Sequence, residues 1–570
     1  MSNPNPRDVQ VLPIATNTTV LRARSWTRLR FEIEYALARG TTINSYLIEG
    51  DKIAIIDPPP ETFTHIYPDA LQKCLDWKRL DYVVLGHYSP SRLATLKAFL
   101  DLAPQITFVC SLPSAANLRT AFPEHDLKIM TMRGKETLDL GQGHVLKFIP
   151  VPSPRWPSGL CTYDQQTQIL YTDKLFGANI CGDEVFDGDW DTFKEDQRYY
   201  FDCLMAPQAN HVKAALEKLS ELPVRMYATG HGPLVRYGLI ELTKAYEDWS
   251  RAQTERDITV ALLYASAYGN TATLAQAIAL GLTKGGVAVE SINCEFAQPE
   301  EIRAAVEKSE GFIIGTPTIG ANAPTPIHTA LGIVLSSSDK NKVAGVFGSY
   351  GWSGEAIDLV ENKLRDSGYR FGFETLRVNF KPTDVVLKQC EETGTDFAQA
   401  LKKAKKLRVP QTAATPVEQA VGRIVGSVCV LTAKLGEVST GMLGAWVSQA
   451  TFNPPGLTVA IAKDRAIESL MYPGGKFALN VLSESNYQDY TRHFRKSFLP
   501  GEDRFASFPT VIADNGCIVL SDALAYLECS VNKRMECGDH WVVYATVDNG
   551  KLLEADGVTA VHHRKSGNHY

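Results

Sequence analysis

The chain has 570 residues, of which 44% are hydrophobic and 21% are charged, and its net charge at pH 7 is -6. This composition is typical of a globular protein, the length predicts three or four domains at roughly 150 residues each, and the charge leaves no footprint for nucleic acid or a membrane surface. The eleven cysteines include no CxxC pair, which argues against a disulfide framework, a zinc ribbon or an iron–sulfur cluster and favours reduced thiols in a cytoplasm. We expect no secretory leader, because the N-terminus is polar, and no transmembrane helix, because no apolar run reaches about 18 residues.

Residues 1–250 group short strands with occasional helices. A strand, a glycine turn and a second strand are predicted over residues 40–57. Further strand-like runs lie at residues 82–85, 106–110, 145–149 and 168–173, and helical runs lie at residues 90–102 and 210–219. This grouping predicts a layered α/β sandwich.

Two histidines matter in this region: His87, just after the strand predicted at residues 82–85, and His231, much later in the chain. Imidazole and carboxylate groups on loops at strand ends are the ligands that converge on a pair of metal ions. A lone histidine is more often structural than a ligand, so a structural role is the alternative for both residues.

The order of these features resembles the metallo-β-lactamase fold. Its members place a His-x-[His/Glu]-x-Asp-His cluster just after a strand and further His and Asp ligands at later strand ends. By this resemblance two ligand positions are retained, His87 and His231, and five are substituted, by Ser89, Ser91, Arg92, Arg155 and Lys174. A register shift of one would place Asp173 where Lys174 falls, but the following Phe-Gly favours Lys174.

The substitutions reverse the local charge. Three carboxylates of the iron-bearing pattern are lost and three cations are gained, Arg92, Arg155 and Lys174, so the charge moves by about six units toward positive. Cations repel a divalent metal, and neither arginine nor protonated lysine has a free lone pair. We therefore predict that no ordinary diiron or dizinc centre forms, and that the pocket holds an anion such as chloride, phosphate or a carboxylate side chain.

Residues 257–405 alternate strands and helices, which predicts a doubly wound parallel sheet. The first strand, residues 259–264, feeds a small hydroxyl-rich loop before a helical run at residues 272–282. Loop N–H groups and the positive helix end can bind a phosphate there. The loop lacks both the lysine of a nucleotide P-loop and a GxGxxG fingerprint, so it suits the monophosphate of FMN, with an ordinary strand–turn–helix as the alternative.

Two further loops at strand ends complete this predicted site, because ligands of such sheets bind at the carboxyl ends of the strands. Tyr350 and Trp352 offer aromatic faces to a flat isoalloxazine ring, although core aromatics would look the same. The three loops together resemble flavodoxin. The predicted FMN contacts are Ser266, Ala267, Tyr268, Gly269, Asn270, Thr271, Thr316, Pro317, Thr318, Ile319, Gly320, Ser349, Tyr350, Gly351, Trp352 and Gly354.

Residues 415–570 follow a Thr/Ala/Pro linker and are rich in predicted strands. A Gly-Met strand at Gly441, a small and hydroxyl stretch, and an Asn before Pro-Pro resemble the flavin reductase family. That family has a split β-barrel, binds FMN or FAD, and takes hydride from NADH or NADPH. The flavin contacts carried over by position are Ala445, Trp446, Ser448, Gln449, Thr451 and Asn480.

Two residues of this last region need separate comment. Trp446 departs from the small or hydroxyl residue usual in the family, which alters the phosphate side of the site. His540 either orders the pocket or is structural. Because the region has no Rossmann motif, the pyridine nucleotide would sit directly against the flavin.

Lactamase-like (1–250), flavodoxin-like (257–405) and reductase-like (415–570) modules in this order resemble the flavodiiron proteins, in the three-module form of oxygenic phototrophs. The resemblance implies electron transfer from NAD(P)H through two flavins to a diiron centre that reduces O2 to water. It also implies head-to-tail pairing, so that the FMN of one chain lies beside the metals of the other. The altered ligands resemble the Flv1-like cyanobacterial type with a degenerate diiron site.

The resemblance also bears on partners and location. It implies a homo- or heterodimer, with an iron-competent flavodiiron paralogue as partner, and a cytoplasmic location with peripheral association with thylakoids left open. The competing hypothesis is a regulatory or assembly subunit whose lactamase-like module recognises an anion or a partner surface. A metallo-hydrolase is disfavoured because a metal-bound nucleophile needs ligands that are missing. No catalytic residue can be assigned from the sequence.

Overall fold

A computed structural model describes residues 7–26, 40–408, 415–436, 438–496, 498, 502–564 and 566–567. The chain folds into two compact units, Met1–Arg256 with Glu290–Ala297, and Asp257–Val289 with Gln298–Tyr570. Among the described helices, none combines the length and apolar character needed to cross a bilayer.

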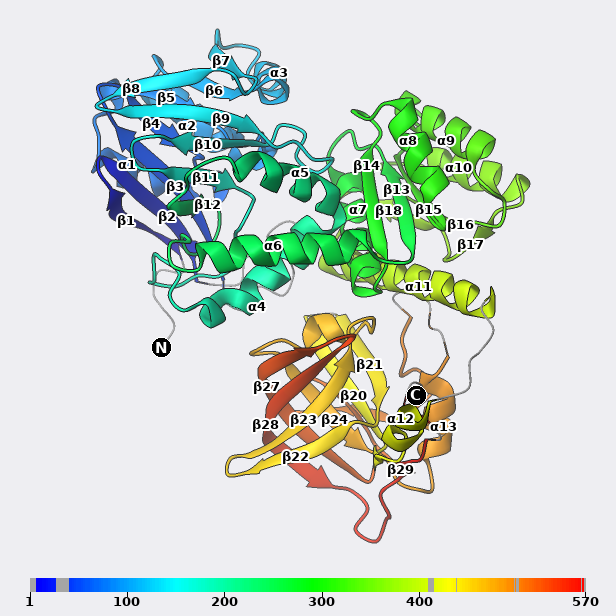
Figure 1. The fold of residues 1–570 in the computed structure, drawn as a ribbon. Helices are drawn as coiled ribbons and strands as arrows, with labels where there is room; N and C mark the ends of the chain where they lie inside the picture. The colour runs from blue at the N-terminus through cyan, green and yellow to red at the C-terminus, as the bar shows by residue number, and fades with distance from the viewer. Residues whose placement is uncertain are drawn as a thin grey trace. The chain divides into compact units, whose positions relative to one another are not determined.

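The lactamase-like module is built on two sheets. The seven-stranded sheet runs in the order β1-β2-β3-β4-β5-β6-β7, and the five-stranded sheet in the order β12-β11-β10-β9-β8 (Figure 1). The strands are β1 (Arg7–Ala15), β2 (Thr18–Ser25), β3 (Thr41–Glu49), β4 (Ile53–Ile56), β5 (Leu80–Val84), β6 (Thr107–Ser111), β7 (Lys128–Met132), β8 (Thr137–Gly141), β9 (His144–Pro150), β10 (Leu160–Asp164), β11 (Ile169–Asp173) and β12 (Met226–Thr229). The helices are α1 (Tyr67–Gln72), α2 (Leu93–Leu102), α3 (Leu112–Ala121), α4 (Trp190–Tyr200), α5 (Ala209–Leu219) and α6 (Leu239–Thr254).

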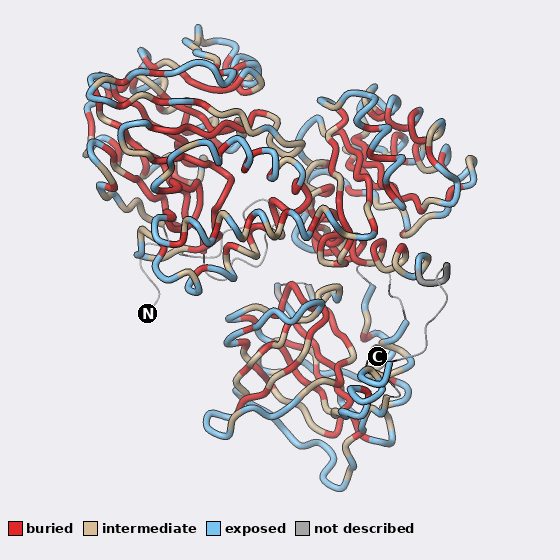
Figure 2. Tube along the Cα trace, viewed as in Figure 1, coloured by how far each residue is buried: buried red, intermediate tan, exposed pale blue. Residues whose placement is uncertain are grey.

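Strand β4 shows why these layers form. All four of its residues are buried apolar side chains, as expected for a strand covered on both faces. Alternate side chains point to opposite faces, and so Ile53 and Ile55 join the core beneath α1 and α2, whereas Ala54 and Ile56 join the core between the two sheets. The buried segments in Figure 2 follow the strands of both sheets. This αββα arrangement confirms the predicted layered α/β sandwich.

The flavodoxin-like module has a parallel sheet in the order β14-β13-β15-β16-β17, and β18 also pairs with β16. Its strands are β13 (Thr259–Tyr264), β14 (Ala288–Asn293), β15 (Gly311–Pro317), β16 (Val343–Tyr350), β17 (Arg370–Phe371) and β18 (Leu376–Asn379). Its helices are α7 (Asn270–Lys284), α8 (Pro299–Lys308), α9 (Thr325–Ser337), α10 (Glu355–Asp366) and α11 (Asp384–Arg408). The predicted doubly wound parallel sheet is confirmed.

The reductase-like module is dominated by one seven-stranded antiparallel sheet in the order β21-β20-β24-β27-β28-β23-β22. Its strands are β19 (Gly426–Ser427), β20 (Cys429–Leu435), β21 (Val438–Gly444), β22 (Val447–Phe452), β23 (Pro455–Ala462), β24 (Lys476–Val481), β25 (Thr510–Ile512), β26 (Ile518–Leu520), β27 (Ala525–Cys537), β28 (His540–Leu552) and β29 (Val561–His562). It also contains α12 (Pro416–Val421) and α13 (Tyr487–Phe494).

Helix α12 was not anticipated from the sequence. Thr415 and Glu418 form a reciprocal capping box, and Pro416 occupies the first turn, where its missing N–H costs nothing. The predicted linker at residues 410–416 lies mostly outside the described residues.

Candidate metal centre and flavin-binding loops

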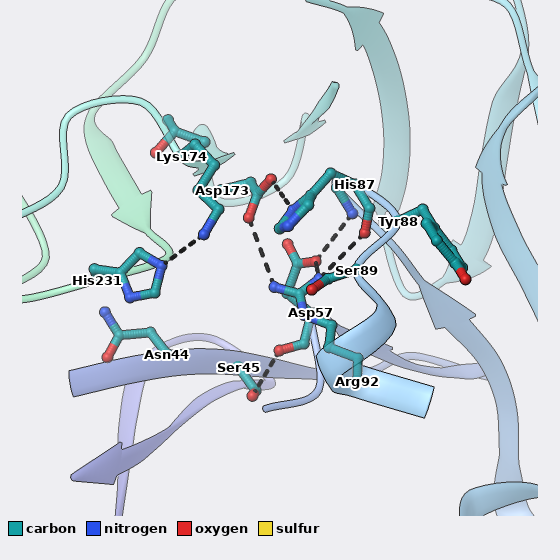
Figure 3. A network of polar contacts seen from close by, with 12 residues as sticks. Asn44, Ser45, Asp57, His87, Tyr88, Ser89, Arg92, Asp173, Lys174 and His231 are labelled. Carbon is teal, nitrogen blue, oxygen red and sulfur yellow. Dashed lines mark hydrogen bonds and ion pairs between the residues drawn. The ribbon is translucent and has the colours of Figure 1, made fainter. Parts of the chain in front are cut away.

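The ends of four strands bring the candidate metal-site residues together (Figure 3). Asp57 directly follows β4, His87 lies just beyond β5, Asp173 ends β11, and His231 follows β12. β4 is parallel to β5 and β11 is parallel to β12, so each pair of neighbouring strands delivers its loops to the same edge. The lactamase-like module therefore gathers polar side chains at one place, as its fold requires.

Asp57, His87 and Asp173 form a buried group whose potential ligand atoms all lie within 4.8 Å of one another. His87 Nδ1 is 2.6 Å from Asp173 Oδ2. Both aspartates adopt left-handed backbone conformations, with φ of 53° at Asp57 and 49° at Asp173, a region that Asp tolerates better than most residues. Neither Asp57 nor Asp173 was assigned as a ligand from the sequence, where Asp173 was only the register alternative to Lys174.

Arg92 fills the space between the two aspartates. Its Nη1 donates to Asp57 Oδ1 at 2.6 Å, and its Nη2 lies 3.7 Å from Asp173 Oδ1. The same Asp57 oxygen accepts a hydrogen bond from the backbone N–H of Gly86 at 3.0 Å. The Arg92 side chain is only 7% exposed. Its charge is therefore balanced by these two carboxylates and is hardly reached by bulk water.

Lys174 forms a second contact on the other side of the site. Its Nζ lies 3.2 Å from His231 Nε2, and His231 Nδ1 lies 3.1 Å from the carbonyl oxygen of Thr42. A carbonyl can only accept, so the Nδ1 atom of His231 carries the proton and Nε2 accepts from the Lys174 ammonium. The Nε2 lone pair, which a metal would use, is thus occupied by a protein cation.

The pKa values follow from this arrangement. Burial raises the pKa of Asp57, with Arg92 opposing and Asp173 reinforcing the change. Burial also opposes ionisation of Asp173, but His87, Arg92 and Lys174 outweigh it and hold the pKa of Asp173 below its usual range. Burial lowers the pKa of His87. Because an ionised carboxylate can only accept, the Nδ1–H of His87 donates the hydrogen bond to Asp173.

The other three substituted positions, Ser89, Ser91 and Arg155, make different contacts. The hydroxyls of Ser89 and Ser91 lie 2.9 Å from each other. Arg155 donates from Nη1 to the Cys203 carbonyl at 3.3 Å, and its guanidinium lies 4.9 Å from the Trp156 ring centroid. Of the five substituted positions, Arg92 and Lys174 make the contacts with Asp57 and His231 described above.

This donor set does not fit a diiron centre. Two buried carboxylates face two buried cations, Arg92 and Lys174, so the group is already balanced in charge. Adding two divalent ions without losing those cations would bury a large uncompensated charge. The carboxylates of Asp57 and Asp173 lie beside Arg92 at this place, and the anion expected from the sequence stays a prediction.

The predicted FMN loops meet at the carboxyl ends of β13, β15 and β16. Ser266 Oγ accepts a hydrogen bond from the N–H of Ala272 in the first turn of α7, at 3.0 Å. The hydroxyls of Thr271 and Ser349 lie 2.8 Å apart, which ties the first loop to the third. The structure thus brings the phosphate loop and the end of β16 into contact.

Features of these loops fit a bound flavin phosphate and ring. Within the described part of the chain, the buried hydroxyl of Thr318, one of the predicted contacts, has no hydrogen-bond partner. A Cβ added to Gly269 or Gly320 would meet no atom of the described residues within 4 Å, so both positions border open space. Tyr268 and Trp352 are 89% and 95% exposed, so both aromatic rings are accessible to a bound flavin.

Five of the predicted reductase-flavin residues lie on β22 or directly before it, and the sixth, Asn480, lies on β24. Ser448, Gln449 and Thr451 lie on β22, at one end of the sheet order. Trp446 has the His540 ring 5.0 Å from its own and the guanidinium of Arg564 at the same distance. Ala445 contributes to the wall of a cavity of about 220 Å³.

Asn480 is placed differently. It is fully buried, its Nδ2 donates to the Val430 carbonyl at 3.1 Å, and its Oδ1 accepts from the N–H of Leu520 at 2.9 Å. Both ends of the amide are used by backbone groups. The geometry therefore favours a structural role for Asn480, and its flavin contact stays a prediction.

Three family models match the chain, one for each module. An "ODP family beta lactamase" model matches residues 41–232, a flavodoxin model residues 262–394, and a flavin reductase like domain model residues 421–568. The combination defines a diflavin electron-transfer oxidoreductase with a lactamase-like module, and the flavodoxin and flavin reductase models identify flavin as its cofactor.

Relatives narrow this class. The chain is 76% identical, over all of both chains, to a Nostoc sp. protein named diflavin flavoprotein A 5, and 44% identical to diflavin flavoprotein A 1 of Synechocystis sp., over 98% of both chains. It is 60% identical to the metal-soaked Flv1 flavodiiron core of Synechocystis sp., which covers 70% of this chain and 100% of that one with a TM-score of 0.69. The chain belongs to the diflavin flavoprotein family of flavodiiron proteins.

Proposed function

We propose that this chain passes electrons from NAD(P)H through a reductase flavin and a flavodoxin FMN toward the reduction of O2 to water, and that the iron pair that completes the reaction belongs to a partner flavodiiron chain. The observation that supports placing the iron pair in a partner chain is the contact of Arg92 Nη1 with Asp57 Oδ1 at 2.6 Å. The module that would hold the metals is closed by its own side chains.

The residues of this chain provide binding and orientation. The hydroxyls and N–H groups of residues 266–271 hold the FMN phosphate at the start of α7, where the helix dipole favours an anion. Tyr350 and Trp352 cover the ring. Bound flavin supplies the conversion of a two-electron donor into single-electron steps.

The deciding experiment measures metal and flavin content together with O2 uptake, for this chain alone and with a flavodiiron paralogue that has intact iron ligands. We expect two flavins per chain, no stoichiometric iron, NAD(P)H oxidation with artificial acceptors, and O2-to-water turnover only in the mixture. Two tightly held irons in the lone chain would contradict the proposal. If neither NADH nor NADPH reduces the flavins, the result would favour the regulatory-subunit hypothesis.

Trp352 provides a narrower test of the FMN site. Because a 95% exposed indole gains most from covering a flat ring, Trp352→Ala is expected to weaken FMN binding about tenfold, which corresponds to about 1.4 kcal/mol. Titration of flavin-stripped protein with FMN, followed by fluorescence quenching, measures the change. Tyr237→Ala, at a 67% exposed ring of the lactamase-like module, serves as the control and should leave the affinity unchanged.

A further inference from the structure

A second network of buried charges lies in the unit formed by residues 257–289 and 298–570. Lys284 lies at the end of α7, Lys388 and Glu391 lie on α11, Glu468 starts the short 3₁₀ helix Glu468–Leu470, and Arg534 lies on β27. The exposed fractions of these five side chains run from 1% to 11%. Two of the elements are flavodoxin-like helices and two belong to the reductase-like module.

The ion pairs cross from one module to the other. Lys284 Nζ lies 2.5 Å from Glu391 Oε1 within the flavodoxin-like module and also pairs with the Glu468 carboxylate of the reductase-like module. Arg534 Nη1 lies 3.2 Å from Glu468 Oε1. Glu468 is therefore clamped between a cation of α7 and a cation of its own module.

Lys388 adds hydrogen bonds across the same boundary. Its Nζ donates to the Ala466 carbonyl at 2.5 Å and to Ser469 Oγ at 2.7 Å. Both acceptors flank Glu468, so one short reductase segment receives donors from α7 and from α11. Beyond this segment, Arg504 Nη2 lies 3.3 Å from Glu392 Oε2.

The pKa values of Lys388 and Glu391 are shifted because both side chains are buried in this cluster. Burial lowers the pKa of Lys388 to about 7. Burial also raises the pKa of Glu391, and the charges of Glu468 and Glu392 add to the shift. Separation of the modules would return water to all of these groups, and so they favour the docked arrangement only while their partners stay in place.

We propose that this cluster is a docking interface that holds the reductase-like module of the same chain against α7 and α11. Since α11 and α12 are joined by a short stretch of chain, docking is intramolecular and a few directional contacts suffice to fix it. The interface fixes the separation of the two flavin sites. That last consequence rests on the proposed function, whereas docking itself does not.

The test compares full-length variants that keep both flavins. Glu468→Lys places a third cation beside Lys284 and Arg534, whereas Glu468→Gln keeps the size of the side chain and removes only its charge. Asp489→Lys is the matched control, because Asp489 pairs with Arg492 on the exposed helix α13, where both side chains are more than 70% exposed. If Glu468→Lys loses flavin, Lys388→Met, which removes the donors to Ala466 and Ser469, takes its place.

We expect Glu468→Lys to increase the radius of gyration in small-angle X-ray scattering and to slow flavin-to-flavin electron transfer at least tenfold in stopped-flow measurements, with reduction of the first flavin by NAD(P)H unchanged. Glu468→Gln should change both values less than Glu468→Lys does, and Asp489→Lys should change neither. An unchanged radius of gyration in flavin-loaded Glu468→Lys and Lys388→Met would overturn the proposal. If no electrons pass between the flavins of the wild type, the proposed function is refuted. Docking is still tested, because the radius of gyration does not depend on electron transfer.

Discussion

Replacement of Arg92 by alanine is expected to destabilise the lactamase-like module by about 3–5 kcal/mol, the range for removing one partner from a buried ion pair. The reason is that Asp57 and Asp173 would remain buried, at 4% and 6% exposure, without the guanidinium that lies between them. Calorimetry of the full-length protein measures the effect as a lowered transition temperature for this module, with flavin release followed separately.

Two comparisons make the Arg92 result specific. Lys97→Ala removes a lysine that pairs with Asp101, and these two side chains are 56% and 59% exposed, so water can replace the pair and the expected loss is below about 1 kcal/mol. The triple variant Arg92→Met, Asp57→Asn and Asp173→Asn removes the charges together and should recover most of the loss, since whole buried ion pairs are often replaceable. If Arg92→Ala leaves the stability unchanged, Asp57 and Asp173 do not depend on Arg92.

Most of the fold could be predicted because the strands carry strong local signals. The runs at residues 82–85 and 168–173 correspond to β5 and β11, and the helical run predicted at residues 210–219 is α5. Parallel strands followed by amphipathic helices leave few topologies. Helix α12 was missed because its signal is a capping box of two side chains rather than hydrophobic periodicity.

The candidate metal site was predicted only in part, since a family pattern lists ligands and not the groups that balance them. His87, His231, Arg92 and Lys174 were identified. The counter-ion Asp57 was passed over, although a carboxylate directly after a fully buried strand is a signal that the sequence contains. Counting only substituted positions made the pocket look strongly cationic, whereas Asp57 and Asp173 neutralise it.

A variant that restores the iron-bearing pattern is expected to bind metal. The changes are Ser89→Glu, Ser91→Asp, Arg92→His, Arg155→His and Lys174→Asp. They remove three cations and add three carboxylates, which moves the local charge by about six units toward negative. We expect stoichiometric iron to rise from well below one to about two per chain, because imidazole and carboxylate ligands then replace the ammonium and guanidinium groups. Metal analysis of anaerobically loaded, desalted protein measures this.

The variant that keeps Lys174 and carries the other four changes separates ligand number from ligand access. In the wild type the Lys174 ammonium lies 3.2 Å from His231 Nε2, so it occupies the lone pair that a second metal needs, and a positive charge remains between the metal positions. We expect this four-change variant to hold at most about one iron per chain. If it binds two, Lys174 does not block the centre, and the loss of metal must be attributed to the other four positions; if the five-change variant binds none, the protein has lost the metal through its scaffold and not through these side chains.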